Sequence, residues 1–570
     1  MCGIFFYVQK DKITGRRKIV IENAFKTIKH RGPDASKVRY YNADAMMGFH
    51  RLAIVDESNN GMQPFESEPS GNSQVRRYAV VCNGEIYGYK DLIQRYNLPV
   101  RSDSDCEVIL HLFEHIIGRN GPASQKVQPE LHHIKELCEL LDGEFAFIIY
   151  DTICGDVFFG VDELRVRPLF IGMNDDKSTF ILASEQKAIT SFDESYHVSI
   201  VLPGCVGAYK NCKFTQEVYF RVPDIKDCQV GPDFVDRHRV LRELLEESIR
   251  KKLNPEREFC FLLSGGLDSS LICGIAAKQL KPMRIRTFTV GFDKNASDII
   301  AARKVAKHIN SIHREFIFTY AQGEAALRDV IRFNESWDQT TTRASVPMFL
   351  AIRAIKDLHP EMAVIYSGEM SDELFMGYME WKQCKDPEES RNHVIKRLIE
   401  ISQFDGLRAD RMVSSQGCEL RLPFFDSDIL LFVMVNDPKW FMPCFNDGIE
   451  KHMLRKAFDG TNIIPHDILW RTKHAFSDAT SIVGASSWKE YLKTRANEEI
   501  TDSRFDERGA LYPYCTPQTK EDMWYREIFD EYGYDATCIP GKWLPNWSNA
   551  DITDASATAL SVFTESAIPQ

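Results

Sequence analysis

The chain reads FCFLLSGGLDSS from residue 259 to residue 270. The five apolar residues at its start are typical of a buried strand, and the two glycines that follow predict a tight turn into a helix. Backbone N–H groups in such a turn, together with the dipole of the helix that begins there, form a cradle for an anion. Because no Gly-Lys-Ser/Thr sequence follows, the turn is not a Walker A loop. The stretch therefore predicts the strand–turn–helix unit of an α/β domain.

Strand and helix patterns alternate around this unit. In chain order they predict a helix at 235–252, a strand at 259–263, a helix at 269–279, a strand at 286–290, a helix at 298–308 and a strand at 315–318. Helical patterns dominate from residue 388 onward. Such alternation is the pattern of a doubly wound parallel sheet with surrounding helices. We predict this architecture for a second domain at residues 234–570.

The first two hundred residues have a different pattern. Short apolar runs that predict strands are separated by turn residues, and helices such as residues 105–117 are few. The predicted strands lie at 4–8, 78–82, 145–150, 157–161 and 180–183. Residues 211–233 combine prolines, a glycine and mixed charge without periodicity, so we place an interdomain linker there. The sequence thus predicts a first domain of packed sheets at residues 2–210.

The composition limits the classes of protein to which the chain can belong. Its 570 residues, 44% of them hydrophobic, suit two domains better than one. Lys and Arg number 70 against 82 Asp and Glu, and the net charge of -12 argues against a general nucleic-acid binder. The 15 cysteines include no CxxC pair, which favours reduced thiols. No apolar run reaches the 18 residues of a membrane span, so we expect a cytoplasmic protein without membrane contact.

The second residue is a cysteine, in the N-terminal sequence MCGI. Removal of Met1 would give Cys2 a free α-amine with a pKa of about 7.7–8.0, low enough for this amine to act as the general base for its own thiol. A single cysteine at this position is weak evidence for catalysis. The possibility becomes specific only in combination with other segments of the first domain.

Four such segments are HRGPD at 30–34, HRLAIVD at 50–56, NGEIY at 83–87 and SDCE at 104–107. With the MCGI start they match, in order, the motifs of the class II glutamine amidotransferases, and within these the chain resembles the asparagine synthetases. The resemblance implies that residues 2–210 form an αββα sandwich of antiparallel sheets, of the N-terminal-nucleophile hydrolase type. It also implies that Cys2 is the catalytic nucleophile that releases ammonia from glutamine.

The same resemblance assigns roles around the substrate glutamine. Arg51 offers a bidentate fork to the substrate carboxylate, and Asp105, with Glu85 nearby, suits the ammonium group. The Asn83 side chain and the Gly84 N–H would be the catalytic donors to the oxyanion, although Asn83-Gly84 taken alone is more typical of a hairpin turn. The implied glutamine-binding residues are Arg51, Leu52, Ala53, Ile54, Val55, Asn83, Gly84, Glu85 and Asp105.

The second domain carries further motifs of the same synthetases. SGGLDSS at 264–270 matches the SGGxDS pyrophosphate loop of ATP pyrophosphatases, YSGEMSDE at 366–373 resembles a segment ending in SGEGSDE, TTTRAS at 340–345 resembles TTIRAS, and EKHMLR at 450–455 resembles EKxxLR. The implied ATP-binding residues are Leu262, Ser264, Gly265, Gly266, Asp268, Ser269, Val290, Ser367, Gly368 and Lys451. By the same resemblance, Thr341 and Arg343 would hold aspartate, Glu369 would be catalytic in forming the intermediate, and Asp268 and Asp372 would bind Mg²⁺.

The resemblance covers nearly the whole chain and implies one reaction in two halves. The β-carboxylate of aspartate attacks the α-phosphorus of MgATP, which gives a β-aspartyl adenylate and pyrophosphate. Ammonia released at Cys2 then displaces AMP and leaves asparagine. Glutamine, aspartate and ATP are therefore the expected small-molecule partners, with Mg²⁺ as the metal, and a homodimer is a possible assembly.

Two departures from the family pattern bear on this expectation. Met370 replaces a glycine in the SGEGSDE segment, and Arg165 replaces a glycine in the segment at 162–169. If these positions have a positive φ, a side chain there costs on the order of 1–2 kcal/mol, and the Met370 side chain would also crowd the adenylate. Two alternatives remain: a two-module amidotransferase with another acceptor, such as a β-lactam synthetase-like protein, and a degenerate synthetase paralogue with a regulatory role.

Overall fold

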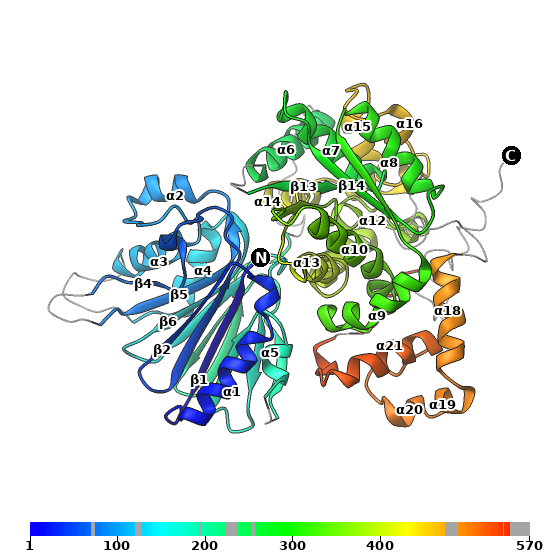
Figure 1. Cartoon of the computed structure of the whole chain (residues 1–570). Helices are drawn as coiled ribbons and strands as arrows, with labels where there is room; N and C mark the ends of the chain where they lie inside the picture. The colour runs from blue at the N-terminus through cyan, green and yellow to red at the C-terminus, as the bar shows by residue number, and fades with distance from the viewer. Residues whose placement is uncertain are drawn as a thin grey trace. The chain divides into compact units, whose positions relative to one another are not determined.

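The computed structural model describes residues 1–69, 75–119, 128–192, 195–223, 236–253, 257–472, 487–539 and 541–547. The chain divides into two compact units (Figure 1). The first unit contains Met1–Arg221, Ser414–Glu419 and Gly533–Cys538, and the second contains Val222–Val413, Leu420–Tyr532 and Ile539–Gln570. Two short downstream segments therefore complete the first unit.

The first unit is built on two six-stranded antiparallel sheets, with strand orders β10-β8-β9-β1-β3-β2 and β12-β11-β7-β6-β5-β4. The strands are β1 (Gly3–Gln9), β2 (Ala35–Tyr41), β3 (Ala45–Arg51), β4 (Phe65–Glu66), β5 (Tyr78–Ile86), β6 (Gly143–Asp151), β7 (Val157–Val161), β8 (Phe170–Met173), β9 (Thr179–Ala183), β10 (His197–Ile200), β11 (Cys205–Lys210) and β12 (Lys213–Val218). The helices that pack on the outer faces of these sheets are α1 (Gly15–Lys26), α3 (Glu107–Arg119), α4 (Leu131–Leu140) and α5 (Lys187–Thr190).

Buried side chains arrange these elements in four layers. Alternate residues of the central strands, such as Phe6 of β1 and Val81 of β5, share one core cluster between the two sheets. Residues of the opposite parity face outward: Phe5 packs with residues of α1 and α5, and Val80 packs with residues of α3 and α4. Figure 1 shows these helices on the outer sides of the sheets. The predicted αββα sandwich is thereby confirmed.

The second unit contains a five-stranded sheet of order β15-β14-β13-β16-β17. Strands β13 (Phe259–Leu262), β14 (Arg286–Gly291), β15 (Ile312–Ile317) and β16 (Val364–Tyr366) pair in parallel, and β17 (Glu419–Arg421) lies next to β16. The helices between and around these strands are α6 (Arg237–Lys252), α7 (Leu267–Gln279), α8 (Ser297–His308), α9 (Tyr320–Asn334) and α10 (Gln339–Leu358). The predicted parallel sheet is confirmed, and the predicted elements between residues 259 and 318 all occur, with ends displaced by at most three residues.

Two local features differ from what the sequence pattern alone suggests. Lys213–Val218, inside the segment predicted as linker 211–233, forms the edge strand β12 against β11. Its side chains are mostly exposed, so no apolar alternation marks it as a strand. Residues 224–233 of that predicted linker lie outside the described residues. Asn83 and Gly84 form no hairpin turn, because both lie within β5 opposite Ala146 and Phe145 of β6.

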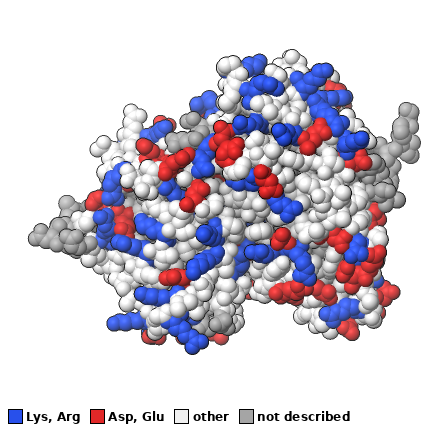
Figure 2. Space-filling model, in the orientation of Figure 1, with Lys and Arg blue, Asp and Glu red and all other residues white. Residues whose placement is uncertain are grey.

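Within the described ranges, no helix combines the length and apolar content needed to cross a membrane. The net charge of -12 does not arise from a surface of one sign. On the visible face, Lys and Arg side chains are interspersed with Asp and Glu (Figure 2).

Candidate functional site

Cys2 lies immediately before β1 and packs against the core between the two sheets. Its Sγ accepts a hydrogen bond from the Leu52 N–H at 3.4 Å and lies 3.6 Å from the Leu52 carbonyl oxygen. Burial raises the pKa of the Cys2 thiol to about 11, although the neighbouring N-terminal ammonium and the Leu52 N–H both act to lower it. The thiol is therefore neutral near pH 7 and needs a base to become a nucleophile.

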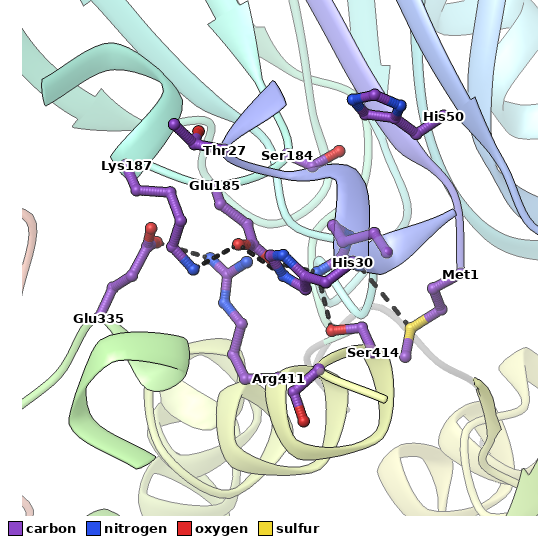
Figure 3. A network of polar contacts seen from close by, with 12 residues as sticks. Met1, Thr27, His30, His50, Ser184, Glu185, Lys187, Glu335, Arg411 and Ser414 are labelled. Carbon is purple, nitrogen blue, oxygen red and sulfur yellow. Dashed lines mark hydrogen bonds and ion pairs between the residues drawn. The ribbon is translucent and has the colours of Figure 1, made fainter. Parts of the chain in front are cut away.

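The backbone of Cys2 is held by Arg31, a residue of the HRGPD motif for which the sequence pattern predicted no role. Arg31 Nε donates to the Cys2 carbonyl at 3.1 Å, and Arg31 Nη1 donates to Glu185 at 2.8 Å. Glu185 is fully buried and also pairs with Lys187 at 2.6 Å and with His30 at 3.1 Å (Figure 3). Three cationic or titratable groups thus converge on one carboxylate, and the carboxylate fixes the arginine that supports Cys2. Nothing in the sequence pattern marks Glu185, because it lies more than 150 residues from Arg31.

A second chain segment presents the residues predicted to hold glutamine. The loop after β3 begins with Leu52, and its backbone is anchored by Asp34, which accepts from the Ala53 N–H at 2.9 Å. Arg51 donates to the Ser58 carbonyl at 2.6 Å and to the Asp56 carbonyl. These bonds fix the guanidinium against the loop on which the predicted contacts at 52–55 lie. Among these loop residues, Leu52, Ala53 and Ile54 are buried and Val55 is partly buried.

The Asn83 side chain is a buried amide that is available to form hydrogen bonds with a ligand. Its side chain is fully buried, yet neither Nδ2 nor Oδ1 has a hydrogen-bond partner among the described residues. By strand alternation it points to the same side of β5 as Val81, into the interlayer core against which Cys2 also packs. Cys82, the preceding residue, is near enough to Cys2 to contribute to the raised pKa of its thiol. The structure therefore brings the Asn83 amide and Cys2 to the same layer of the first unit.

Gly84 is required by the close approach of two strands. A Cβ at Gly84 would lie 2.5 Å from the Glu144 carbonyl oxygen. The Phe145 backbone opposite Gly84 directs both its N–H and its carbonyl to Asp162, at 3.2 and 2.8 Å. In an antiparallel ladder only alternate opposed pairs exchange backbone hydrogen bonds, so the Gly84 N–H points away from β6. This orientation suits a backbone donor to a ligand.

The predicted ammonium-binding carboxylates lie at the end of β5 and the start of α3. Asp105 Oδ2 accepts from the Ile86 N–H at 2.7 Å, which ties the two elements together. Glu85 is buried in β5, one residue after Gly84. The pKa of the Cys106 thiol is raised, most strongly by a hydrogen bond with the Cys82 thiol. The charges of Asp105 and Glu85 also act to raise it. The two carboxylates therefore share one neighbourhood.

In the second unit, the turn between β13 and α7 has the conformation that its glycines predict. Gly265 has φ +80°, and a Cβ there would lie 2.4 Å from the Ala302 backbone nitrogen. Hydroxyl groups close the turn: Ser264 and Ser269 are 2.9 Å apart, and the Gly266 N–H donates to Ser264 Oγ at 3.2 Å. Gly368 comes close to the same turn, because its Cβ would lie 2.9 Å from the Ser269 nitrogen.

Lys451 joins the two carboxylates that were predicted to bind metal. Its Nζ lies 2.6 Å from Asp268 and 2.7 Å from Asp372, and the Ser371 hydroxyl donates to Asp268 at 2.7 Å. The lysine is buried and has φ +55°, at the N-terminus of α15 (His452–Phe458). A Cβ at Gly377 would lie 2.1 Å from both Lys451 Cε and an Asp372 oxygen. The structure thus brings together three predicted residues from segments that are far apart in the sequence.

Two carboxylates that face a single cation beside a glycine-rich turn fit a magnesium nucleotide. Mg²⁺ in phosphate-transfer sites is commonly held by one or two carboxylates together with substrate phosphate oxygens. Asp268 and Asp372 supply that number of carboxylates, and the Lys451 ammonium between them shows that their oxygens converge on one position.

Glu369 follows β16 and pairs with Arg408 of α13 (Asp405–Ser414) at 2.9 Å. The next residue, Met370, has φ +80° and an exposed fraction of only 2%. Arg165 of the first unit has φ +57°. Both non-glycine residues therefore adopt the left-handed conformation on which the predicted strain depends. Burial and the nearby acidic residues Asp405 and Asp372 raise the pKa of Glu373 to about 8.

The residues predicted to hold aspartate have other partners in this structure. Arg343 Nε and Nη2 both donate to Glu521, at 2.7 and 2.5 Å, and both side chains are buried. The Thr341 N–H donates to Asp338 at 2.9 Å within the first turn of α10. Aspartate binding by these residues stays a prediction, and at Arg343 a substrate carboxylate would have to share or replace Glu521. No local pattern could reveal this acid, which lies 178 residues away.

The remaining predicted nucleotide contacts lie at the ends of adjacent strands. Leu262 ends β13, and Val290 is buried near the end of β14. Ser367 follows β16, and its N–H donates to the Arg421 carbonyl of β17 at 3.2 Å. In a parallel sheet these positions share the carboxyl edge, where ligands of doubly wound folds bind.

Comparisons with known proteins extend over both units. The glutamine amidotransferase domain family matches residues 1–199, and the asparagine synthase family matches residues 240–401 and 380–532. Glutamine-hydrolyzing asparagine synthetases from Rattus norvegicus and Mus musculus are each 36% identical to this chain over 596 residues, covering 100% of both chains. The Homo sapiens protein of the same name is 35% identical over 589 residues, with 98% of each chain covered. This chain therefore belongs to the glutamine-hydrolysing asparagine synthetase family.

Proposed function

We propose that this protein makes asparagine from aspartate, with glutamine as the nitrogen donor and ATP as the energy source. The observation that carries the proposal is the likeness to the glutamine-hydrolysing synthetases over the whole length of the chain. The residues support it, because a candidate amide-hydrolysing site lies in the first unit and a candidate nucleotide site lies in the second. The products are asparagine, glutamate, AMP and pyrophosphate.

In the first half of the proposed reaction, Met1 is removed and the α-amine of Cys2 accepts the proton of its own thiol. A base is required because even an ordinary cysteine thiol, with a pKa of about 8.5, is mostly neutral near pH 7. Sγ attacks the carboxamide carbon of glutamine, and the oxyanion receives hydrogen bonds from Asn83 Nδ2 and the Gly84 N–H. On collapse of the intermediate, the α-ammonium of Cys2 gives its proton to the leaving nitrogen, which departs as ammonia, and water then hydrolyses the thioester to glutamate and the free thiol. The buried, unpartnered Asn83 amide supports this assignment.

Arg51, Glu85 and Asp105 orient the glutamine in this proposal. The Arg51 guanidinium pairs with the substrate carboxylate, and the two acidic residues attract its ammonium group. The backbone of residues 52–55 lines the site between these charges. Because glutamine carries both charges, this arrangement distinguishes it from simple amides.

In the second half, the turn at 264–269 and Lys451 bind the phosphates of ATP, with Leu262, Val290, Ser367 and Gly368 beside the nucleotide. Mg²⁺ bound with ATP supplies charge neutralisation at the phosphates, with Asp268 and Asp372 as its protein ligands. Lys451 steadies the pyrophosphate leaving group, Thr341 and Arg343 hold aspartate, and Glu369 is the catalytic carboxylate of adenylate formation.

The proposal also includes the domain limits 2–210 and 234–570, a cytoplasmic location and a homodimer. Fractionation of cells that express the tagged protein tests the location, and light scattering on the purified protein tests the assembly.

A single assay tests the proposed reaction. Purified protein is incubated with ¹⁵N-amide glutamine, aspartate, ATP and Mg²⁺, and the products are followed by mass spectrometry and chromatography. Asparagine labelled in its side-chain amide, with AMP and pyrophosphate in equal amounts, is the expected result. Glutamate without AMP would reduce the proposal to glutamine hydrolysis alone, and AMP formation with a different amide product would indicate another acceptor. Intact-mass measurement must also show that Met1 is absent.

A further inference from the structure

Arg408 is a buried cation that contacts two partly exposed carboxylates, one of which is the predicted catalytic carboxylate Glu369. Its exposed fraction is 4%. Arg408 Nη2 donates to Glu369 Oε2 at 2.9 Å and to Asp405 Oδ1 at 2.8 Å, and its Nε lies 3.3 Å from the same Asp405 oxygen. Nη1 lies 3.7 Å from the Met348 sulfur. The guanidinium therefore bridges two carboxylates, one of which belongs to the candidate active site.

The two carboxylates keep this guanidinium charged although it is buried. Burial alone lowers the pKa of Arg408, but the charges and hydrogen bonds of Glu369 and Asp405 outweigh it and raise the pKa above its usual value. A buried cation with two anionic partners is retained because removal of one member leaves an uncompensated charge in the interior. The Nη2 hydrogen bond directs one Glu369 oxygen toward the guanidinium, because the planar fork of an arginine sets the direction of each of its hydrogen bonds.

Further contacts restrict Arg408 itself. Asp405 is the first residue of α13 and lies one turn before Arg408, a spacing at which helical side chains meet. The Tyr378 hydroxyl lies 3.1 Å from the second oxygen of Asp405 and also pairs with Glu373. Both oxygens of Asp405 therefore have polar neighbours, and the single Tyr378 proton goes either to Asp405 or to Glu373.

The position of Glu369 explains why it needs such support. It lies in a turn between β16 and the four-residue helix α11 (Ser371–Leu374), and a left-handed residue follows it. A short irregular segment limits its side chains less than a long helix or a central strand does. Contact with a rigid neighbouring helix supplies the missing constraint.

We propose that Arg408, held by Asp405 and Tyr378, is a positioning residue that sets the orientation of Glu369 for adenylate formation. The inference rests on the proposed function. It adds three residues, from two further segments, to the apparatus of the synthetase half. Substrate binding is left to other groups: the phosphates belong to the turn at 264–269 and to Lys451.

The inference predicts a specific split between kinetic constants. Arg408→Lys keeps the charge but loses the fork, and a misplacement of about 1 Å at a reacting group costs on the order of 100-fold in rate. We expect aspartate-dependent exchange of labelled pyrophosphate into ATP to fall about 10–100-fold in kcat, with the KM for ATP changed by less than about threefold. Tyr378→Phe removes a more distant contact and should lower kcat in the same sense by a smaller factor. Glutamine hydrolysis should stay unchanged in both variants.

Arg397→Lys is the matched control. Arg397 is also buried in the second unit, and it forms a two-pronged pair with Glu380 at 3.1 Å. Arg397→Lys should change the exchange kcat by less than about twofold. Its unfolding midpoint should change by about as much as that of Arg408→Lys. If the wild-type protein shows no aspartate-dependent exchange, the proposed function fails. The positioning role is wrong if the wild-type protein catalyses exchange and Arg408→Lys has the same kcat as wild type or as Arg397→Lys. It is also wrong if Arg408→Lys raises the KM for ATP as strongly as it lowers kcat.

Discussion

Replacement of Asn83 by leucine should separate the stability of the first unit from its activity. The Asn83 side chain is fully buried, and neither of its polar atoms has a hydrogen-bond partner among the described residues. Leucine has the same number and branching of side-chain heavy atoms and no polar atoms, so the variant removes an amide whose desolvation no protein group offsets. The folded state should therefore gain stability, although the bulkier methyl groups of leucine oppose part of that gain.

The two expected effects have opposite signs and different sizes. Relief of a buried, unpartnered polar group is worth about 1–2 kcal/mol of unfolding free energy. Loss of one oxyanion donor costs about 3–4 kcal/mol in the transition state, which corresponds to about a 100- to 1000-fold decrease in kcat for glutamine hydrolysis. In the proposed mechanism the amide acts only when substrate is present, so only the second effect should appear in kinetics.

Urea denaturation and a glutamate-release assay measure the two quantities, and synthesis from added ammonia serves as an internal control that should not change. Asn334→Leu is a matched variant in the second unit. Asn334 is also fully buried, but its Nδ2 donates to Ser345 at 2.8 Å, and only its Oδ1 has no hydrogen-bond partner among the described residues. It should therefore lose stability, by about 1 kcal/mol, and keep glutamine hydrolysis. The reasoning is refuted if Asn83→Leu is less stable than wild type by more than about 1 kcal/mol, or if it hydrolyses glutamine at a rate within threefold of wild type.

Three further substitutions test other parts of the structure. Met370→Gly removes a left-handed backbone strain of about 1–2 kcal/mol, but it also removes a buried side chain worth about 2–5 kcal/mol. Urea denaturation should therefore show that the variant loses about 1–3 kcal/mol of unfolding free energy. A gain in stability would mean that the strain dominates. Gly84→Ala places a Cβ 2.5 Å from the Glu144 carbonyl oxygen and should abolish glutamate release but not ammonia-dependent synthesis, whereas Gly88→Ala, whose Cβ would meet nothing closer than 4.0 Å, should retain both. Although burial opposes it, two acidic neighbours raise the pKa of His111 to about 9, so its stabilising charge is present below about pH 6.5 and lost as pH rises through about 9. Wild type should lose on the order of 2 kcal/mol over that range, and His111→Gln should show little of this loss; an unchanged pH profile in the variant would contradict the assignment.

Sequence patterns predicted most of the architecture because it depends on local chemistry. The strand, glycine turn and helix at 259–279 follow from apolar periodicity and from the conformational freedom of Gly265. The edge strand β12 was missed because exposed edge strands lack the alternation that marks half-buried ones. Motifs also placed Lys451 near Asp268, but only through family resemblance, since 183 residues separate them.

The residues that support the site were less accessible to sequence reasoning. Glu185, Arg408 and Glu521 act through partners that come together only in the folded chain. Acidic and basic residues are common, and no spacing rule distinguishes a buried ion-pair partner from a solvated surface residue. The left-handed conformation of Met370 was predictable because a glycine normally occupies that position in the family.

The first unit contains segments from far downstream in the sequence, and this determines when it can complete its folding during translation. Its structure is completed by Ser414–Glu419 and Gly533–Cys538, and the ammonium of Met1, the residue that the proposed mechanism removes, donates to the Cys418 carbonyl at 3.2 Å. Translation must therefore proceed past residue 538, through nearly the entire synthetase sequence, before every segment of the first unit exists. A nascent or truncated chain that ends at the linker lacks these segments. In the proposed mechanism, a chain that stops at the linker therefore lacks part of the unit that hydrolyses glutamine.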